Sequence, residues 1–183
     1  KEFVFIWKGM TLAGYFKWER NTDKSLNSSK NKHLRDENVY FVNTQILDFK
    51  KNVLRNLPDK SSQGLLQKKV LLVGLGAIGG YMAEALVKLG AGIESDFVLV
   101  DKDILEADNV GRHLLGFQFC GNFKSLALIS YLQSNSFFQL TKIRSEIKDI
   151  SSFNNSFFEN ENFDLIIDAT GSIEVQEYLN EMI

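Results

Sequence analysis

Cysteine, proline and histidine are scarce in this sequence. Its 183 residues include one cysteine, Cys120, one proline and two histidines. A single cysteine cannot form an internal disulfide, and so few cysteines and histidines offer no ligand cluster for a structural zinc ion. These absences exclude a fold stabilised by disulfides or zinc, and they predict a protein of the reducing cytoplasm.

Long hydrophobic runs and an excess of one charge are also missing. The apolar runs cover only a few residues, whereas about 20 are needed to cross a bilayer, and no signal peptide is visible. The formal net charge is −2, and lysines are scattered among acids, so nothing favours nucleic acid or a membrane surface as a partner. What is present is the composition of a soluble globular protein, with 44% hydrophobic and 24% charged residues.

The character of the chain changes near residue 68. Aromatic and β-branched residues at 3–18 predict two short strands, the polar stretch 21–38 predicts a loop, and apolar residues at helical spacing over 42–57 predict a helix. We expect residues 1–67 to be an N-terminal extension or the end of a preceding domain, and residues 68–183 to be one domain. The chain begins with lysine and ends inside an expected helix, so we expect a fragment, truncated at its C-terminus.

From residue 68 onward, apolar strands alternate with helices. Continuous apolar runs predict strands at 70–73, 97–100 and 163–167, and a weaker pattern predicts one at 140–147. Apolar spacing predicts helices at 78–89, 123–132 and after Ser172, which is a suitable N-cap. Strands that are apolar throughout are typical of a mostly parallel sheet with helices on both faces, so the fold class is a Rossmann-like α/β domain.

A glycine-rich turn joins the first of these strands to its helix. It reads Gly74-Leu75-Gly76-Ala77-Ile78-Gly79, the GxGxxG pattern of nucleotide-binding turns. Gly74 permits the tight turn, Gly76 lets a phosphate approach the backbone, and Gly79 lets the helix pack closely on the strand. The start of the helix, from Ala77, offers unpaired N–H groups and a partial positive charge to an anion.

An acidic residue ends the second strand, as such sites require. Asp101 lies 25 residues after Gly76, where a carboxylate accepts hydrogen bonds from ribose hydroxyls. The alternative is that Asp101 only terminates the strand or starts a turn.

The segment after Asp101 favours ATP over NAD. A dehydrogenase is expected to continue into its next helix, whereas here an irregular segment carries Asn109 and Arg112, and Lys124 opens the helix that follows. Three phosphates carry more charge than a helix N-terminus can balance, and Arg and Lys near the glycine turn would supply the remainder.

These residues resemble the ubiquitin-activating-enzyme/ThiF/MoeB/HesA adenylating family, and above all its prokaryotic ThiF-type members. The family follows its glycine turn with Asp-x-Asp, then Asn-x-x-Arg, then a lysine about a dozen residues on. The matching positions are Asp101 and Asp103, Asn109 and Arg112, and Lys124. The resemblance covers roughly residues 68–183.

The resemblance implies an enzyme that uses Mg-ATP to adenylate the C-terminal carboxylate of a ubiquitin-like or sulfur-carrier protein, releasing pyrophosphate. It implies that Asp101 holds the ribose and that Asn109, Arg112 and Lys124 act in catalysis by orienting and neutralising the phosphates. Cofactor contacts are further expected from Asp103, Asp168 and the glycine turn. Family members usually work as homodimers or pseudo-symmetric dimers.

One position departs from the family pattern. The family commonly has Asp-x-Thr-Asp after its later strand, with the last aspartate on Mg²⁺, and this chain reads Asp168-Ala169-Thr170-Gly171. No metal ligand is therefore assigned: ATP and another carboxylate hold Mg²⁺, or the domain binds nucleotide poorly. Two other readings stay open, an inactive Rossmann partner or scaffold subunit and, with less support, an NAD-dependent oxidoreductase. Any catalytic cysteine is expected beyond residue 183.

Overall fold

The computed structural model describes residues 53–55, 64–136 and 140–182. The strands and the loop predicted within residues 3–38 lie outside this part, so the expected N-terminal extension stays a prediction. Residues 53–55, inside the predicted helix 42–57, are helical, and Val53 is buried.

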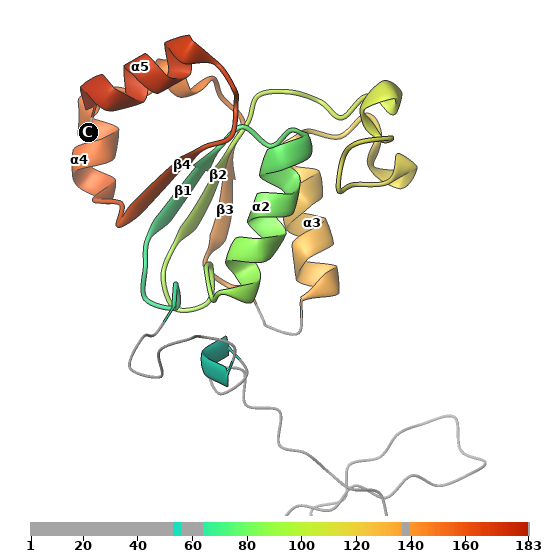
Figure 1. Cartoon of the computed structure of the whole chain (residues 1–183), viewed down its shortest axis with the longest axis horizontal. Coiled ribbons are helices and arrows are strands. Elements are labelled where there is room, and N and C mark those ends of the chain that lie inside the picture. Colours follow the sequence, from blue (N-terminus) through green and yellow to red (C-terminus); the bar gives the residue numbers. More distant parts are fainter. Residues whose placement is uncertain (1–52, 56–63, 137–139, 183) are drawn as a thin grey trace, which may run out of the picture. The chain divides into compact units, whose positions relative to one another are not determined.

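Four parallel strands form the sheet of the domain (Figure 1). They are β1 (Val70–Val73), β2 (Phe97–Val100), β3 (Ile143–Glu146) and β4 (Leu165–Asp168), in the order β3-β2-β1-β4. In register, Val73 pairs with Val100 on one side and with Asp168 on the other, so three strands end at the same level. The four strands predicted from residue 68 onward are present, with β4 starting two residues later than predicted, and the Rossmann-like fold class is confirmed.

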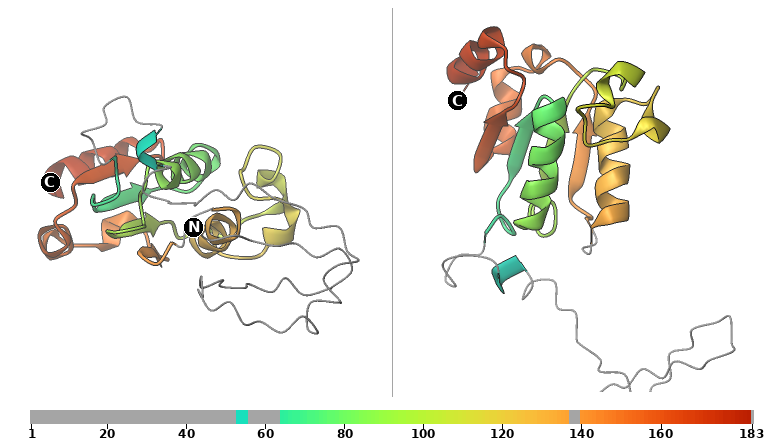
Figure 2. Two further views of the ribbon diagram at one scale, coloured as in Figure 1. Left: turned by 90° about the horizontal axis from the view of Figure 1, so that it is seen from below. Right: turned by 45° about the vertical axis from the view of Figure 1, so that its right-hand side comes forward.

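Helices cover both faces of this sheet. α2 (Ala77–Lys88) and α3 (Lys124–Asn135) lie on one face, and α4 (Asn155–Glu161) and α5 (Ile173–Met182) lie on the other (Figures 1 and 2). Alternate residues of β1 enter the two cores: Val70 and Leu72 pack with α2 and α3, while Leu71 and Val73 pack with α4 and α5. Both faces of β1 and β2 are buried, which explains why these two central strands are apolar without alternation. No helix in the described ranges is both long and apolar enough for a membrane span.

Helix α4 is the element that the sequence pattern does not predict. It has seven residues, and Asn154 caps it by accepting a hydrogen bond from the Phe157 N–H at 3.3 Å. Its sequence is mostly polar, and Phe158 is its one buried residue. So short a helix offers too few apolar positions for a periodic signal. By contrast, α5 starts as predicted, with the Ser172 hydroxyl accepting from the Val175 N–H at 3.4 Å.

Helix α2 buries only part of the apolar stripe that its sequence suggests. Its buried residues are Gly79, Gly80, Ala83, Leu86 and Val87, whereas Ile78 is 70% exposed and Leu89 is 41% exposed. Close packing decides the face, because a side chain at position 79 would strike the glycine turn itself. The first two turns therefore bury the small residues Gly79, Gly80 and Ala83, and the last turn buries Leu86 and Val87.

Candidate functional site

The candidate site lies where β1, β2 and β4 end. The order in which strands are added to the sheet reverses at β1, since β2 and β3 lie on one side of β1 and β4 lies on the other. Ligands of open α/β sheets bind outside the carboxyl ends of the strands at such a point. Gly74, Asp101 and the segment from Asp168 to Gly171 all follow these strand ends.

The glycine turn fits tightly against the segment after β4. Gly74 has φ +82°, and a Cβ there would lie 2.7–2.9 Å from atoms of Thr170. A Cβ at Gly79 would lie 1.9 Å from the Gly74 carbonyl oxygen, whereas a Cβ at Gly76 would meet no atom within 4 Å. Two glycines are thus required by the fold, and the third borders open space. Thr170 has no place in the sequence-based site, because nothing in its sequence context shows that it packs on Gly74.

Four N–H groups at the start of α2 are unpaired within the described residues. They belong to Gly76, Ala77, Ile78 and Gly79, and the first helical bond to Gly76 comes from the Gly80 N–H at 2.9 Å. The first turn of α2 contains no acidic side chain. Such a group of free donors with the positive end of the helix dipole attracts an anion.

The Asp101 carboxylate joins the turn to the chain after β2. Its Oδ2 accepts the Leu75 N–H at 2.7 Å and its Oδ1 accepts the Asp103 N–H at 2.8 Å. The bond from the Asp103 N–H starts a turn after β2, which is the alternative role of Asp101, and the bond from the Leu75 N–H is an additional contact. A carboxylate oxygen has two acceptor positions, so the same group retains the capacity to bind ribose hydroxyls.

Lys124 and Asp103 form an ion pair. The Lys124 Nζ lies 3.0 Å from Asp103 Oδ2, and the Lys124 N–H donates to the Asp103 carbonyl at 2.9 Å. Lys124 is the first residue of α3, and its side chain is only 12% exposed. The structure thus brings two of the predicted residues together.

Lys102 lies between Asp101 and Asp103 in the sequence, but its side chain forms an ion pair with Asp149. Its Nζ is 2.6 Å from Asp149 Oδ2. That hydrogen bond, together with those from Ser151, lowers the pKa of Asp149 from 3.8 to about 2. The charge of the Lys102 ammonium group is therefore already paired with the Asp149 carboxylate.

Asn109 shapes the turn that carries Arg112. Its Oδ1 accepts the Glu106 N–H at 3.3 Å, and its carbonyl accepts the N–H groups of Arg112 and His113, each at 3.0 Å. The amide side chain is thus used within the loop, and its contribution is to set the direction in which the chain reaches Arg112.

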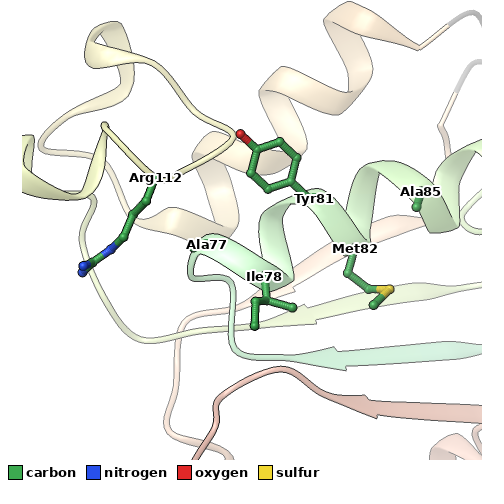
Figure 3. A pocket seen from close by; sticks show the side chains of 6 residues that line it. All are labelled: Ala77, Ile78, Tyr81, Met82, Ala85 and Arg112. Carbon is green, nitrogen blue, oxygen red and sulfur yellow. The ribbon is translucent and has the colours of Figure 1, made fainter.

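Arg112 lies beside the start of α2. Both border a shallow hollow of about 510 Å³, lined by Ala77, Ile78, Tyr81, Met82, Ala85 and Arg112 (Figure 3). Arg112 is exposed, and its guanidinium has no ion pair or hydrogen bond with the described residues. Arg112, which has no counter-charge among the described residues, thus borders the same hollow as Ala77 and Ile78, which carry two of the free N–H groups.

His113 is a part of the site that sequence reasoning does not place. It is buried, with Nε2 2.7 Å from the Leu75 carbonyl oxygen and Nδ1 accepting the Leu115 N–H at 3.0 Å. Its position directly after Arg112 is the one signal in the sequence, but the partner on the glycine turn is visible only in the fold.

Asp168 offers one carboxylate beside the turn. Its Oδ1 accepts both the N–H and the hydroxyl of Thr170, at 2.9 and 2.6 Å. Gly171 follows with φ +70° and open space around it. No group of three or more His, Cys, Asp or Glu residues that could hold a metal ion occurs in the described part of the chain.

A parallel sheet with a glycine turn opening a helix at the switch point defines a Rossmann-like nucleotide-binding class of domain. The ThiF family model matches residues 49–183, and the chain belongs to the ThiF family. The resemblance read from the sequence is therefore confirmed.

Relatives and solved structures agree with this assignment. The chain is 33% identical over 138 residues to the "ATP-dependent ubiquitin transferase-like protein Cap2" of Escherichia coli (strain TW11681), covering 70% of this chain and 21% of that relative. It is 37% identical over 127 residues to the Cap2 protein of Vibrio cholerae serotype O1, covering 68% and 21%. The chain thus spans about a fifth of the length of these relatives.

Among solved structures, the E. coli tRNA N6-threonylcarbamoyladenosine dehydratase TcdA in complex with ATP has a similar fold. Its TM-score is 0.57 at 21% identity, over 68% of this chain and 49% of that one. At this identity the likeness concerns the fold alone.

Proposed function

We propose that this chain binds ATP at the ends of β1, β2 and β4 and adenylates the C-terminal carboxylate of a ubiquitin-like or sulfur-carrier protein. The observation that carries the proposal is the guanidinium of Arg112, which has no partner among the described residues, beside the free N–H groups of α2. These groups supply positive potential for phosphates, while Asp101 lies within hydrogen-bond distance of the same turn and would accept from the ribose.

In the proposed reaction, a carboxylate oxygen of the protein tail attacks the α-phosphorus of ATP. A new O–P bond forms, the bond to the β-phosphate oxygen breaks, and pyrophosphate leaves with the electron pair. The chain positions the reactants and balances charge, which is the usual source of catalysis in such transfers. Arg112 and the N–H groups of Gly76 and Ala77 would bind phosphate oxygens. The Lys124 ammonium group would also bind a phosphate oxygen after its ion pair with Asp103 breaks.

The names of relatives and structural neighbours support the proposal that the chain binds ATP and acts on a protein partner. Cap2 is named an ATP-dependent ubiquitin transferase-like protein, and MccB, a structural neighbour with a TM-score of 0.51, has been solved with AMPCPP and MccA. We propose that the whole protein acts in the cytoplasm as a homodimer or a pseudo-symmetric dimer.

Few of the described residues near the turn could act as ligands of Mg²⁺. Mg²⁺ in nucleotide sites is held by one or two carboxylates, waters and phosphates. Here Asp168 can offer one oxygen, Oδ2, since Oδ1 is engaged by Thr170, and Gly171 has no side chain. Mg²⁺ would neutralise phosphate charge, with Asp168 as its protein ligand and the nucleotide holding the rest.

Replacing Gly171 with aspartate is expected to strengthen the dependence of ATP binding on Mg²⁺. The added side chain meets open space, and aspartate tolerates positive φ better than most residues, at a cost of about 1 kcal/mol. In calorimetry, Gly171→Asp should bind ATP more weakly than wild type in EDTA, through charge repulsion, and more tightly in Mg²⁺. Gly171→Asn carries the same backbone strain without the charge. Equal Mg²⁺ dependence in the two variants would contradict this expectation.

Adenylation itself is tested by ATP–pyrophosphate exchange on the full-length protein, together with ATP and NADH binding to the 183-residue chain. We expect ATP binding, little NADH binding, and exchange that requires the protein acceptor. Binding of ATP without any exchange would support the scaffold reading, for which Gly171 is the argument. Binding of NADH in preference to ATP would overturn the proposal.

A further inference from the structure

The two hydrogen-bond partners of the His113 ring fit one tautomer of the neutral imidazole. Nδ1 lies 3.0 Å from the Leu115 nitrogen, whose hydrogen it must accept, so Nδ1 carries no proton. Nε2 lies 2.7 Å from the Leu75 carbonyl oxygen, which can only accept, so Nε2 carries the proton and donates it. The neutral Nε2–H tautomer is therefore the form that satisfies both partners.

These bonds immobilise the peptide between Leu75 and Gly76. The Leu75 N–H is held by Asp101 Oδ2 at 2.7 Å, and its carbonyl is held by His113. The peptide is trans, so the Gly76 N–H points opposite to the Leu75 carbonyl. Holding the carbonyl toward His113 therefore turns the Gly76 N–H, the first of the four free donors, away from the ring.

His113 also connects this turn to the loop that carries Arg112. His113 is 6% exposed, and its ring lies against Gly80, where a Cβ would be 3.4 Å from Cε1. Because Arg112 is the preceding residue, the bond to Leu75 fixes the start of the arginine side chain relative to the first turn of α2. One side chain thus fixes both sources of positive potential in the site.

We propose that His113 is a positioning residue of the phosphate site, aiming the Gly76 N–H and holding the Arg112 loop against the glycine turn. The inference rests on the proposed function for the identity of the ligand, but the bond between ring and turn is independent of it. A histidine that only fills the core would affect stability alone. A positioning histidine affects phosphate binding in the fully folded protein.

Three substitutions separate these roles. His113→Gln places an amide nitrogen near the position of Nε2 and retains a donor to Leu75. His113→Asn places an oxygen near Nδ1, retaining the acceptor for Leu115 but not the donor to Leu75, and His113→Phe keeps the ring shape with neither. We expect ATP affinity to fall about tenfold in the Asn and Phe variants and to remain near wild type in the Gln variant.

The ligand series makes the result specific. Affinity for adenosine, measured by calorimetry at a temperature where each variant is fully folded, should be unchanged while affinity for ATP falls. Equal losses for adenosine and ATP, or wild-type ATP affinity in both the Asn and Phe variants, would overturn the positioning role.

A second measurement needs no nucleotide. The ¹⁵N shifts of the His113 ring in the 183-residue chain should show a protonated Nε2 and an unprotonated Nδ1, and a His33→Gln variant assigns the signals because the sequence has only two histidines. The opposite tautomer, or a doubly protonated ring at neutral pH, would overturn the inference. Failure of wild type to bind ATP would overturn the proposed function instead and leave this readout decisive for the ring.

Discussion

Replacing Gly79 with alanine is expected to lower the free energy of unfolding by about 3 kcal/mol or more. The new Cβ would lie 1.9 Å from the Gly74 carbonyl oxygen and 2.9 Å from its carbon, both backbone atoms. Overpacking against mobile side chains costs about 1–3 kcal/mol, but here neither neighbour can rotate away. Either α2 lifts from the sheet or the turn opens, and both changes expose the buried face of α2.

Urea unfolding measures this loss, and Gly76→Ala is its matched control. Gly76 lies three residues earlier, has φ −73°, and has open space where a Cβ would stand. Its unfolding free energy should stay within about 1 kcal/mol of wild type, the usual range for a mild substitution, while ATP binding is lost because the methyl group occupies the approach of a phosphate. Equal stability of the two variants would show that the close packing of α2 is not required.

Replacing Arg112 with alanine is expected to weaken ATP binding by roughly 10- to 150-fold, the equivalent of one charge-assisted hydrogen bond of about 1.5–3 kcal/mol. The guanidinium is exposed and makes no ion pair with the described residues, so its removal leaves no buried charge behind. Stability should therefore hardly change, and the loss of affinity can be assigned to the phosphate contact.

Lys102→Ala is the control for Arg112→Ala. It also removes one positive charge close to Asp101, but that charge is paired with Asp149 at 2.6 Å. Calorimetry with ATP should show a large loss for Arg112→Ala and less than a twofold change for Lys102→Ala. Similar losses in both would mean that overall charge attracts the nucleotide and that Arg112 makes no specific contact.

Much of the fold follows from local patterns. Strands at 70–73 and 97–100 are continuous apolar runs between turns, and the start of α5 is marked by Ser172 as its cap. These signals depend on residues within a few positions of one another, which is why they can be read directly. Helix α4 has no such local signal, because its short polar sequence contains a single buried residue, Phe158.

For the candidate site, too, the sequence names the residues but not their contacts within the protein. The glycine turn, Asp101, Asn109, Arg112 and Lys124 can be named from spacing, because the order of chemical groups along the chain is itself the signal. Their nucleotide contacts stay predictions. Their contacts within the protein were not predictable, since Lys124 pairs with Asp103 across 21 residues of sequence and the Arg112 loop meets α2 only after folding.

The sequence by itself determined the Rossmann-like class, the glycine turn and the family, because each is encoded by residue type and local spacing. Only the tertiary structure decided which face of α2 is buried, that Thr170 closes on Gly74, and that His113 holds the Leu75 carbonyl. The contact of Thr170 with Gly74 joins residues 96 positions apart, and the bond of His113 to Leu75 joins residues 38 positions apart. Close packing and hydrogen-bond pairing between distant segments are set by the whole sheet, so no local pattern contains them.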